Sequence, residues 1–339
     1  MCKKNIVVYL CGLSILISGC NNEFDTISYA DPVPVVYGIL TPQESVHSIR
    51  ITRSFIGEKS FDEMVRNPDS LYFTDAKVFV ELRSGDGFCH SRGEFFPIEQ
   101  SPRNPGLFPE SPNYLYQNST LLIPNSFYEN DILYLVFNMT IPSLNQSVFA
   151  RTTVPYKPKV IEPVPGARGT SMDLYGAKPF YAQWYRDTLF YYEFIIEVNY
   201  TNFDSLDLPD PKLISYRHPI GHFAQWQIDS IGPIHEFLLT KNLFFKIMKA
   251  KTDKNEVSYR KIGKINFILQ NADKPWTDYL DALEFQSDYY TNVISNIVNG
   301  MGLFIAYNRI KFEGFTLDAR SIDSLALSQE TKSLKFVRW

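Results

Sequence analysis

Short segments in which apolar and polar residues alternate dominate the first half of the chain. In residues 46–55 apolar side chains recur between charged or hydroxyl-bearing ones, and residues 76–82 repeat the pattern. Because successive side chains of a strand point to opposite faces of a sheet, this alternation predicts strands with one buried face. Further strands are predicted at 33–40, 132–139 and 148–154. About seven strands separated by turn residues favour a β-sandwich over residues 31–157, with a short helix at 60–66.

A stretch rich in proline and glycine follows. Residues 158–169 contain three prolines and two glycines. Proline removes a hydrogen-bond donor from a strand ladder, and glycine weakens strand interiors. We therefore predict an interdomain linker at 158–169, and we expect residues 155–169 to be especially sensitive to proteases.

The second half, residues 170–339, returns to a strand pattern. Trp184, in the strand predicted at 180–184, resembles the core tryptophan of immunoglobulin-like sheets, and without a paired cysteine the likeness is closer to the fibronectin type. Residues 204–235 are predicted to form a long insertion. Other strands are predicted at 189–203, 236–249, 262–269 and 302–317, and a helix at 276–285. The expected fold is mainly β, with two tandem β-sandwich domains of immunoglobulin or fibronectin type and one or two short helices.

Composition narrows the class of protein. The chain has 339 residues, 45% of them hydrophobic and 15% aromatic, and a formal net charge of −4. Extended disorder is excluded because the apolar content is ordinary for a globular protein. No basic excess is present to neutralise phosphates, so we expect no nucleic-acid partner.

The N-terminus has the pattern of a bacterial lipoprotein signal. Lys3 and Lys4 precede an apolar run at 6–17, which is too short to span a bilayer about 30 Å thick as a helix. The run ends in Ile17-Ser18-Gly19-Cys20, which resembles a lipobox. This predicts a signal peptide at 1–19, cleavage between Gly19 and Cys20, lipid on Cys20, and a lipidated tether at 20–30. The alternative is an ordinary signal peptide with an accidental cysteine.

Lipidation would determine how the mature protein is attached to a membrane. Each buried acyl CH₂ contributes about 0.8 kcal/mol, so two or three chains give stable attachment to a membrane. Cys2 and Cys11 would leave with the signal, and Cys89 would remain as a lone thiol, expected to be half-buried. Residues 21–25, four of which are polar, resemble the export signal of surface-exposed lipoproteins in Bacteroidetes. A plain solvated linker explains them equally well.

Several stretches together resemble the domain-of-unknown-function 4249 family of Bacteroidetes lipoproteins. Besides the lipobox, they are the segments 34–40, 51–58, 67–72, 76–82 and 295–304. The resemblance implies a protein anchored by lipid in the outer membrane, with N-terminal sandwich domains and no known activity. Members often accompany outer-membrane transporters.

A recurrent triplet marks candidate modification sites. Six times, Asp followed by Ser or Thr is then followed by Ile or Leu, a pattern that resembles the acceptor site for O-glycosylation in Bacteroidetes envelope proteins. The candidate hydroxyls are Thr26, Ser70, Thr188, Ser205, Ser230 and Ser324. We expect Thr188, Ser230 and Ser324 to border strands. Turns formed by Asp, Ser and Thr before strands would select the same residues.

Metal-ligating patterns are weak. His218 and His222 have i,i+4 spacing, but Pro219 and Gly221 lie between them, so a helical zinc pair is not expected. A loop site with His235, or calcium on Asp204, Asp207 and Asp210, stays open as an alternative. The remaining histidines are His47 and His90.

Motifs for catalysis or cofactor binding are missing from the sequence. It contains no G-x-S-x-G elbow and no P-loop, and Ile305 stands where a dinucleotide fingerprint beginning at Gly300 needs its third glycine. We expect no catalytic residue, no metal and no cofactor. The sequence therefore favours a non-catalytic binding or accessory protein of the outer membrane, with a transporter or a glycan as partner and its membrane face undecided. The alternative is a surface glycan hydrolase that uses carboxylates of residues 204–235.

Overall fold

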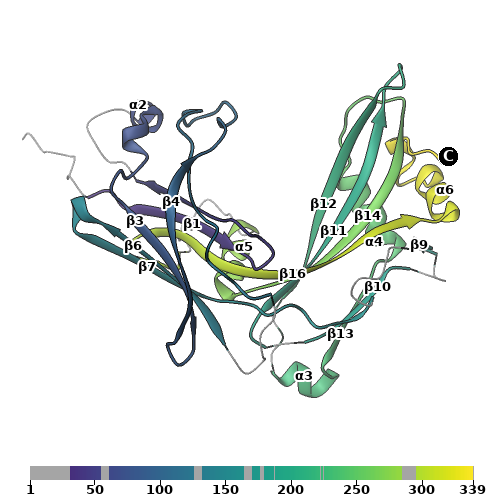
Figure 1. Ribbon diagram of the computed structural model, residues 1–339. Coiled ribbons are helices and arrows are strands. Elements are labelled where there is room, and N and C mark those ends of the chain that lie inside the picture. Colours follow the sequence, from purple (N-terminus) through teal and green to yellow (C-terminus); the bar gives the residue numbers. More distant parts are fainter. Residues whose placement is uncertain are drawn as a thin grey trace, which may run out of the picture.

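The computed structural model describes residues 31–54, 61–125, 132–163, 170–175, 179–186, 188–221, 223, 225–284 and 295–338. The predicted signal peptide, its cleavage site at Gly19 and Cys20, and the tether with Thr26 lie outside these residues. Figure 1 shows two β-rich halves, which a long strand, β16, joins.

Strands dominate both halves, which confirms the mainly β prediction. The first half contains β1 (Pro34–Leu40), β2 (His47–Arg53), β3 (Lys77–Ser84), β4 (Cys89–Glu99), β5 (Tyr114–Asn118), β6 (Leu133–Ile141) and β7 (Gln146–Thr153). The rest of the chain adds β8 (Val160–Glu162), β9 (Ser171–Met172), β10 (Tyr181–Tyr185), β11 (Tyr191–Phe203), β12 (Pro209–Gly221), β13 (Ile234–Leu238), β14 (Tyr259–Ala272), β15 (Ile297–Val298) and β16 (Met301–Leu317).

The helices are short. The described residues form α2 (Phe61–Arg66), α3 (Gln225–Ile231), α4 (Lys241–Lys251), α5 (Lys274–Glu284) and α6 (Ala319–Leu327), with 3-10 turns η1 (Pro68–Ser70), η2 (Pro142–Leu144) and η3 (Lys332–Leu334). Helices α2 and α5 match the two that the sequence predicts. No helix in the described part of the chain is both long enough and apolar enough to cross a membrane.

Helix α4 corrects the strand predicted at 236–249. Strand β13 ends at Leu238, and Thr240 then caps a helix by accepting a hydrogen bond from Leu243 N at 3.2 Å. Phe244, Phe245 and Met248 are buried, a spacing that fits one face of a helix. The cap and this period outweigh the strand preference of the aromatic residues.

The first half is a β-sandwich. Strands β16, β1, β2 and β5 form one layer, β3, β6, β7 and β15 the other, and β4 bends between them. Residues 89–95 of β4 pair with β3, and residues 96–99 pair with β5. Alternating side chains of both layers, such as Ile49, Val80 and Phe137, fill the core between them.

The second half has its own aromatic core. It lies between the antiparallel strands β12, β11, β14 and β16 and a smaller sheet of β13, β10 and β8. Trp184 is fully buried there, stacked on Phe194 with ring centroids 6.2 Å apart. This agrees with the core role expected for Trp184.

Strand β16 belongs to both halves. Residues 301–306 pair in parallel with β1, and residues 307–315 pair antiparallel with β14. Phe304 and Ala306 of β16, together with Ile297 of β15, lie in the first core, although the predicted boundaries assign residues 170–339 to the second domain. The hydrophobic pattern of a strand cannot show which sheet it will join, because both sheets present the same period.

Two other predicted segments are more regular than expected. Residues 160–162, within the predicted linker, form β8 and pair with β10, whereas residues 164–169 lie outside the described residues. Residues 209–221, within the predicted insertion, form β12 and pair with β11 along the whole strand. β12 lies at the end of the strand order, and an edge strand tolerates proline because one row of its backbone groups needs no partner.

Candidate functional site

The strongest candidate for a binding site is a hollow on the outer face of β1 and β2. We call it the arginine pocket; its volume is about 540 Å³, and it is lined by Val35, Tyr37, Arg50, Thr52, Arg53, Leu71, Arg103 and Phe108. Strand alternation explains how β2 contributes: Ile49 and Ile51 point into the core, so Arg50 and Thr52 point outward. Register pairs Tyr37 with Arg50, and residues 101–112 supply the opposite wall.

Two guanidinium groups lie side by side in the arginine pocket. Arg50 Nη1 and Arg103 Nε both donate to Oδ1 of Asn113, at 3.1 and 3.0 Å. Asn113 is itself buried, and its Nδ2 donates to Ser101 O at 2.9 Å. Arg103 Nη2 also donates to Tyr72 Oη at 2.5 Å. A neutral amide and a phenol therefore hold the two cations close together.

No carboxylate balances this positive charge. Over the described ranges, none of Arg50, Arg53 and Arg103 forms an ion pair. Burial and the neighbouring Arg103 lower the pKa of Arg50. Nε of Arg53 is buried without a hydrogen-bond partner. Like charges held together in a partly buried place favour a bound anion, because the anion would remove their repulsion.

Apolar groups complete the walls. Tyr37 and Phe108 are each 47% exposed, and Val35 and Leu71 lie beside them. The guanidinium carbon of Arg103 lies 5.8 Å from the ring centroid of Phe108. A concave, mostly apolar surface with a few convergent polar groups is typical of a site for a small ligand.

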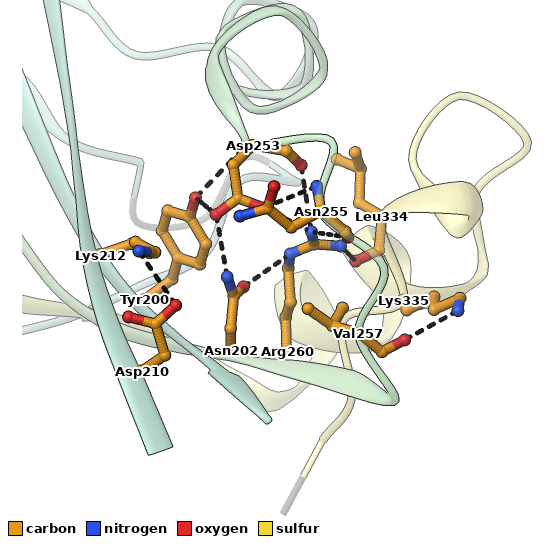
Figure 2. A network of polar contacts seen from close by, with 10 residues as sticks. All are labelled: Tyr200, Asn202, Asp210, Lys212, Asp253, Asn255, Val257, Arg260, Leu334 and Lys335. Carbon is orange, nitrogen blue, oxygen red and sulfur yellow. Dashed lines mark hydrogen bonds and ion pairs between the residues drawn. The ribbon is translucent and has the colours of Figure 1, made fainter. Parts of the chain in front are cut away.

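The arginine pocket differs sharply from the buried arginine of the second half. Arg260 is 3% exposed, and Figure 2 shows its guanidinium surrounded by acceptors. Its Nε donates to Asn202 Oδ1 at 2.9 Å, Nη1 to Leu334 O at 2.8 Å, and Nη2 to Asp253 Oδ1 at 2.8 Å and Asn255 O at 3.1 Å. With its charge paired and its donors used, Arg260 has a structural role.

Asp253 completes this network from the loop after α4. Tyr200 Oη donates to Asp253 Oδ2 at 3.0 Å, and Asn202 Nδ2 donates to the same oxygen at 2.9 Å. Burial would raise the pKa of Asp253, but hydrogen bonds from Asn202, Arg260 and Tyr200 hold it below its usual value. The network ties β11, β14 and the C-terminal segment together (Figure 2).

A second hollow, of about 350 Å³, lies over β3, β6 and β7. Its acidic residue, Glu81, already has partners within the chain. Glu81 lies 2.7 Å from Arg83 Nη2 and 3.7 Å from Arg92 Nη1. The guanidinium of Arg151 covers the ring of Tyr134 at 3.5 Å. Glu81 is thus paired and the Tyr134 ring is covered by Arg151, whereas the arginine pocket brings together three arginines that form no ion pair with the described residues. The arginine pocket is therefore the better candidate.

The structure places the predicted modification sites in different settings. Thr188, Ser205 and Ser230 are exposed, whereas Ser70, in η1, and Ser324 are half-buried; Thr26 lies outside the described residues. The expectation that Ser230 and Ser324 border strands is wrong, because they lie in α3 and α6. Ser324 Oγ is hydrogen-bonded to Tyr175 Oη.

The carboxylates considered for calcium or for hydrolysis form no metal-binding group of three among the described residues. Asp204 accepts hydrogen bonds from Leu206 N and Leu208 N, at 2.8 and 3.0 Å. Asp207 accepts from Tyr259 Oη at 2.9 Å, and Asp210 is paired with Lys212 at 2.9 Å. Each carboxylate has a separate partner within the chain.

Histidines and the thiol show no metal arrangement. No group of three or more His, Cys, Asp or Glu that could hold a metal occurs where the structure describes the chain, and His222 lies outside that part. Burial, together with Arg186, lowers the pKa of His235 to about 4. The expected burial of Cys89 is wrong, because this residue is exposed.

Sequence reasoning did not identify the arginines of the pocket. Arg50 and Arg53 occupy the strand predicted at 46–55, where alternation places Arg50 on the solvated face and Arg53 on the face of Ile49 and Ile51. Arg103 follows about fifty residues later in a proline-rich loop. Only the outward positions of Arg50 and Tyr37 could have been inferred, because alternation fixes the face but not the distant residues that meet it.

Comparison with known proteins adds little. No family model matches the chain, and no curated protein matches it. Among solved structures, CBD12 from CALX1.2 has 9% identity and a TM-score of 0.17, covering 82% of this chain and 99% of its own. The calcium binding domain CBD12 of CALX1.1 has 9% identity and a TM-score of 0.15, covering 80% and 98%. Likeness at this level carries no argument about fold or function.

Proposed function

We propose that this protein is a lipid-anchored component of the bacterial cell envelope that binds a ligand or partner without catalysing a reaction. The lipobox ending in Cys20 and the resemblance to the domain-of-unknown-function 4249 family support the anchor and the outer-membrane location. The arginine pocket is the proposed binding site. The single observation that carries this proposal is the gathering of Arg50, Arg53 and Arg103 without a carboxylate partner among the described residues.

An anionic ligand or an acidic segment of a partner fits this site. Guanidinium groups form charge-assisted hydrogen bonds with carboxylate and phosphate oxygens, and these are stronger than neutral ones. An outer-membrane transporter is the proposed partner, because lipoproteins with the resembling motifs often accompany one.

Membrane fractionation tests the anchor. The Cys20→Ser variant should lose the acyl mass and leave the membrane fraction, because the thiol carries the lipid. Cys89→Ser is the matched control, since it removes an exposed thiol from the folded part and should leave fractionation unchanged. A Cys20→Ser protein that still fractionates with the outer membrane at unchanged mass would contradict the anchor.

Affinity purification from detergent-solubilised membranes tests the accessory role. Wild-type protein is expected to retain a stoichiometric outer-membrane transporter. Arg53→Gln should weaken this association if the pocket contacts the partner, while Arg66→Gln, an exposed change in α2, should not. Purification of the protein without any stoichiometric membrane partner would count against the accessory role.

The alternative of a glycan hydrolase has no comparable support. Asp204, Asp207 and Asp210 are each engaged with a separate donor of the chain. A pair of carboxylates on either side of a bound sugar is what hydrolysis requires.

A further inference from the structure

We infer that the arginine pocket binds the phosphate group of a ligand whose body is apolar or aromatic. The inference rests on the proposed binding function and names its ligand class.

The number and charge of the donors favour phosphate over carboxylate. A guanidinium offers five N–H donors, and the described contacts of Arg50 and Arg103 use only some of theirs. Arg53 donates no described side-chain hydrogen bond, and its Nε is buried without a hydrogen-bond partner, although its guanidinium carbon lies 5.4 Å from the ring centroid of Phe73. A phosphate monoester presents three oxygens and close to two negative charges, whereas a carboxylate presents two oxygens and one charge. Phosphate therefore matches the neighbouring cations Arg50 and Arg103 better, and Arg53 also lines the pocket.

Among the described residues, the loop that carries Arg103 supplies no carboxylate that pairs with its guanidinium. Arg103 N donates to Glu110 O at 2.9 Å, so the loop folds back on itself at this point. The Glu110 side chain nevertheless forms no ion pair with the described residues, although it lies close in sequence. Arg103 therefore has no ion-pair partner among the described residues, which leaves the cation available to a ligand.

The apolar walls indicate more than an inorganic ion. The pocket measures about 540 Å³, a size typical of sites for organic ligands. Val35 and Leu71 offer aliphatic contact, and Tyr37 and Phe108 offer exposed rings. A phosphate held by the arginines would place the organic part of an ester against these side chains.

Calorimetric titration of the full chain in detergent with matched probes tests the ligand class. Phenyl phosphate should bind more tightly than benzoate, which carries the same ring with a carboxylate. It should also bind more tightly than inorganic phosphate, which lacks the ring. Glycerophosphoglycerol, a phosphodiester with a single negative charge and no ring, is expected to bind more weakly than phenyl phosphate. If it binds equally well, neither the second charge nor the ring contributes, and the inference is overturned.

Variants assign the binding to the pocket. Arg53→Gln should weaken phenyl phosphate binding roughly tenfold or more, because a hydrogen bond between charged groups is lost. This change removes no described side-chain hydrogen bond but removes the contact with the Phe73 ring, so circular dichroism and thermal denaturation verify that the variant is folded. Arg50→Lys should also weaken binding, since it keeps the charge but loses the planar fork. Arg66→Gln is the control, with the same loss of charge on exposed α2 and unchanged affinity expected.

The outcomes separate this inference from the proposed function. Equal affinities for benzoate and phenyl phosphate would overturn phosphate as the ligand class, while membrane attachment and partner purification could still succeed. No binding of phenyl phosphate at millimolar concentration would overturn it as well. Unchanged affinity in folded Arg53→Gln and Arg50→Lys proteins would place any binding elsewhere and also overturn it.

Discussion

The ring of Phe304 lies directly against the bare backbone of Gly38. A Cβ atom at Gly38 would lie 2.8 Å from Cδ2 of Phe304, closer than carbon atoms tolerate. The two residues face each other in the parallel pairing of β1 with β16. Segments 34–40 and 295–304, both part of the family resemblance, therefore meet in one ladder although they are more than 250 residues apart.

Gly302 in the same ladder cannot accept a side chain. Its φ is +111°, and a Cβ would lie 2.0 Å from Val36 O. We expect Gly302→Ala to lower the free energy of unfolding by about 3 kcal/mol or more, because backbone strain is added to a clash that only a main-chain shift can relieve. Urea denaturation of the purified protein measures this loss.

Gly87 provides the control for backbone strain alone. Its φ is +89°, but no atom lies within 4 Å of an added Cβ. Gly87→Ala should therefore cost only about 1 kcal/mol. Equal losses at both glycines would contradict the role of the contact with Val36.

Arg260 should be the most sensitive arginine for stability. Arg260→Gln would leave Asp253 partly buried without its cation, and we expect a loss of about 3 kcal/mol in the free energy of unfolding. Arg338→Gln is the matched control, because Arg338 pairs with Asp323 at the surface and should change stability by well under about 1 kcal/mol. Thermal and urea denaturation of both variants check this; similar small losses would show that the network in Figure 2 is dispensable.

Stability should fall in mild acid because of His235. Burial and Arg186 hold its folded-state pKa at about 4, below a value of about 6.5 in the unfolded chain. As pH falls from 7 towards 4, His235 is protonated in the unfolded chain but stays neutral in the folded protein. The free energy of unfolding therefore decreases. The contribution is about 2 kcal/mol, which allows for partial exposure of the ring.

The variant His235→Gln isolates this effect. It should flatten the dependence of the unfolding free energy on pH between 7 and 4. Some slope will remain, since burial also lowers the pKa of His47 and of His218. A slope identical to that of the wild type would argue against a buried neutral His235.

Whether a triplet is glycosylated should depend on how exposed its hydroxyl group is. If the triplets are acceptor sites, Thr188, Ser205 and Ser230 are expected to be modified, because their side chains are exposed. Ser324 should stay unmodified in folded protein, since its hydroxyl is hydrogen-bonded to Tyr175. Intact-mass measurement of protein from its native host checks this, with Ser205→Ala as the variant and Ser324→Ala as the control. A mass equal to polypeptide plus lipid would leave turn formation as the reason for the triplets.

Local sequence patterns were sufficient to predict the class of fold and many of its single strands and helices. Alternation placed the strand at 76–82, which the structure has as β3, and apolar spacing placed the helix at 276–285, which it has as α5. The prediction of a strand at 236–249 was wrong because aromatic residues occur in helices as well as in strands. There the cap at Thr240 and burial on one face decided for a helix.

The sequence by itself determined a mainly β chain, because the two-residue period that buries one face of a strand is written locally along it. Only the tertiary structure decided that β16 would join both halves, since pairing of β1 with residues 301–306 depends on a contact between distant segments. The arginine pocket has the same origin. Arg50 and Arg103 become neighbours only when a loop folds across the outer face of β2, and no local pattern carries that information.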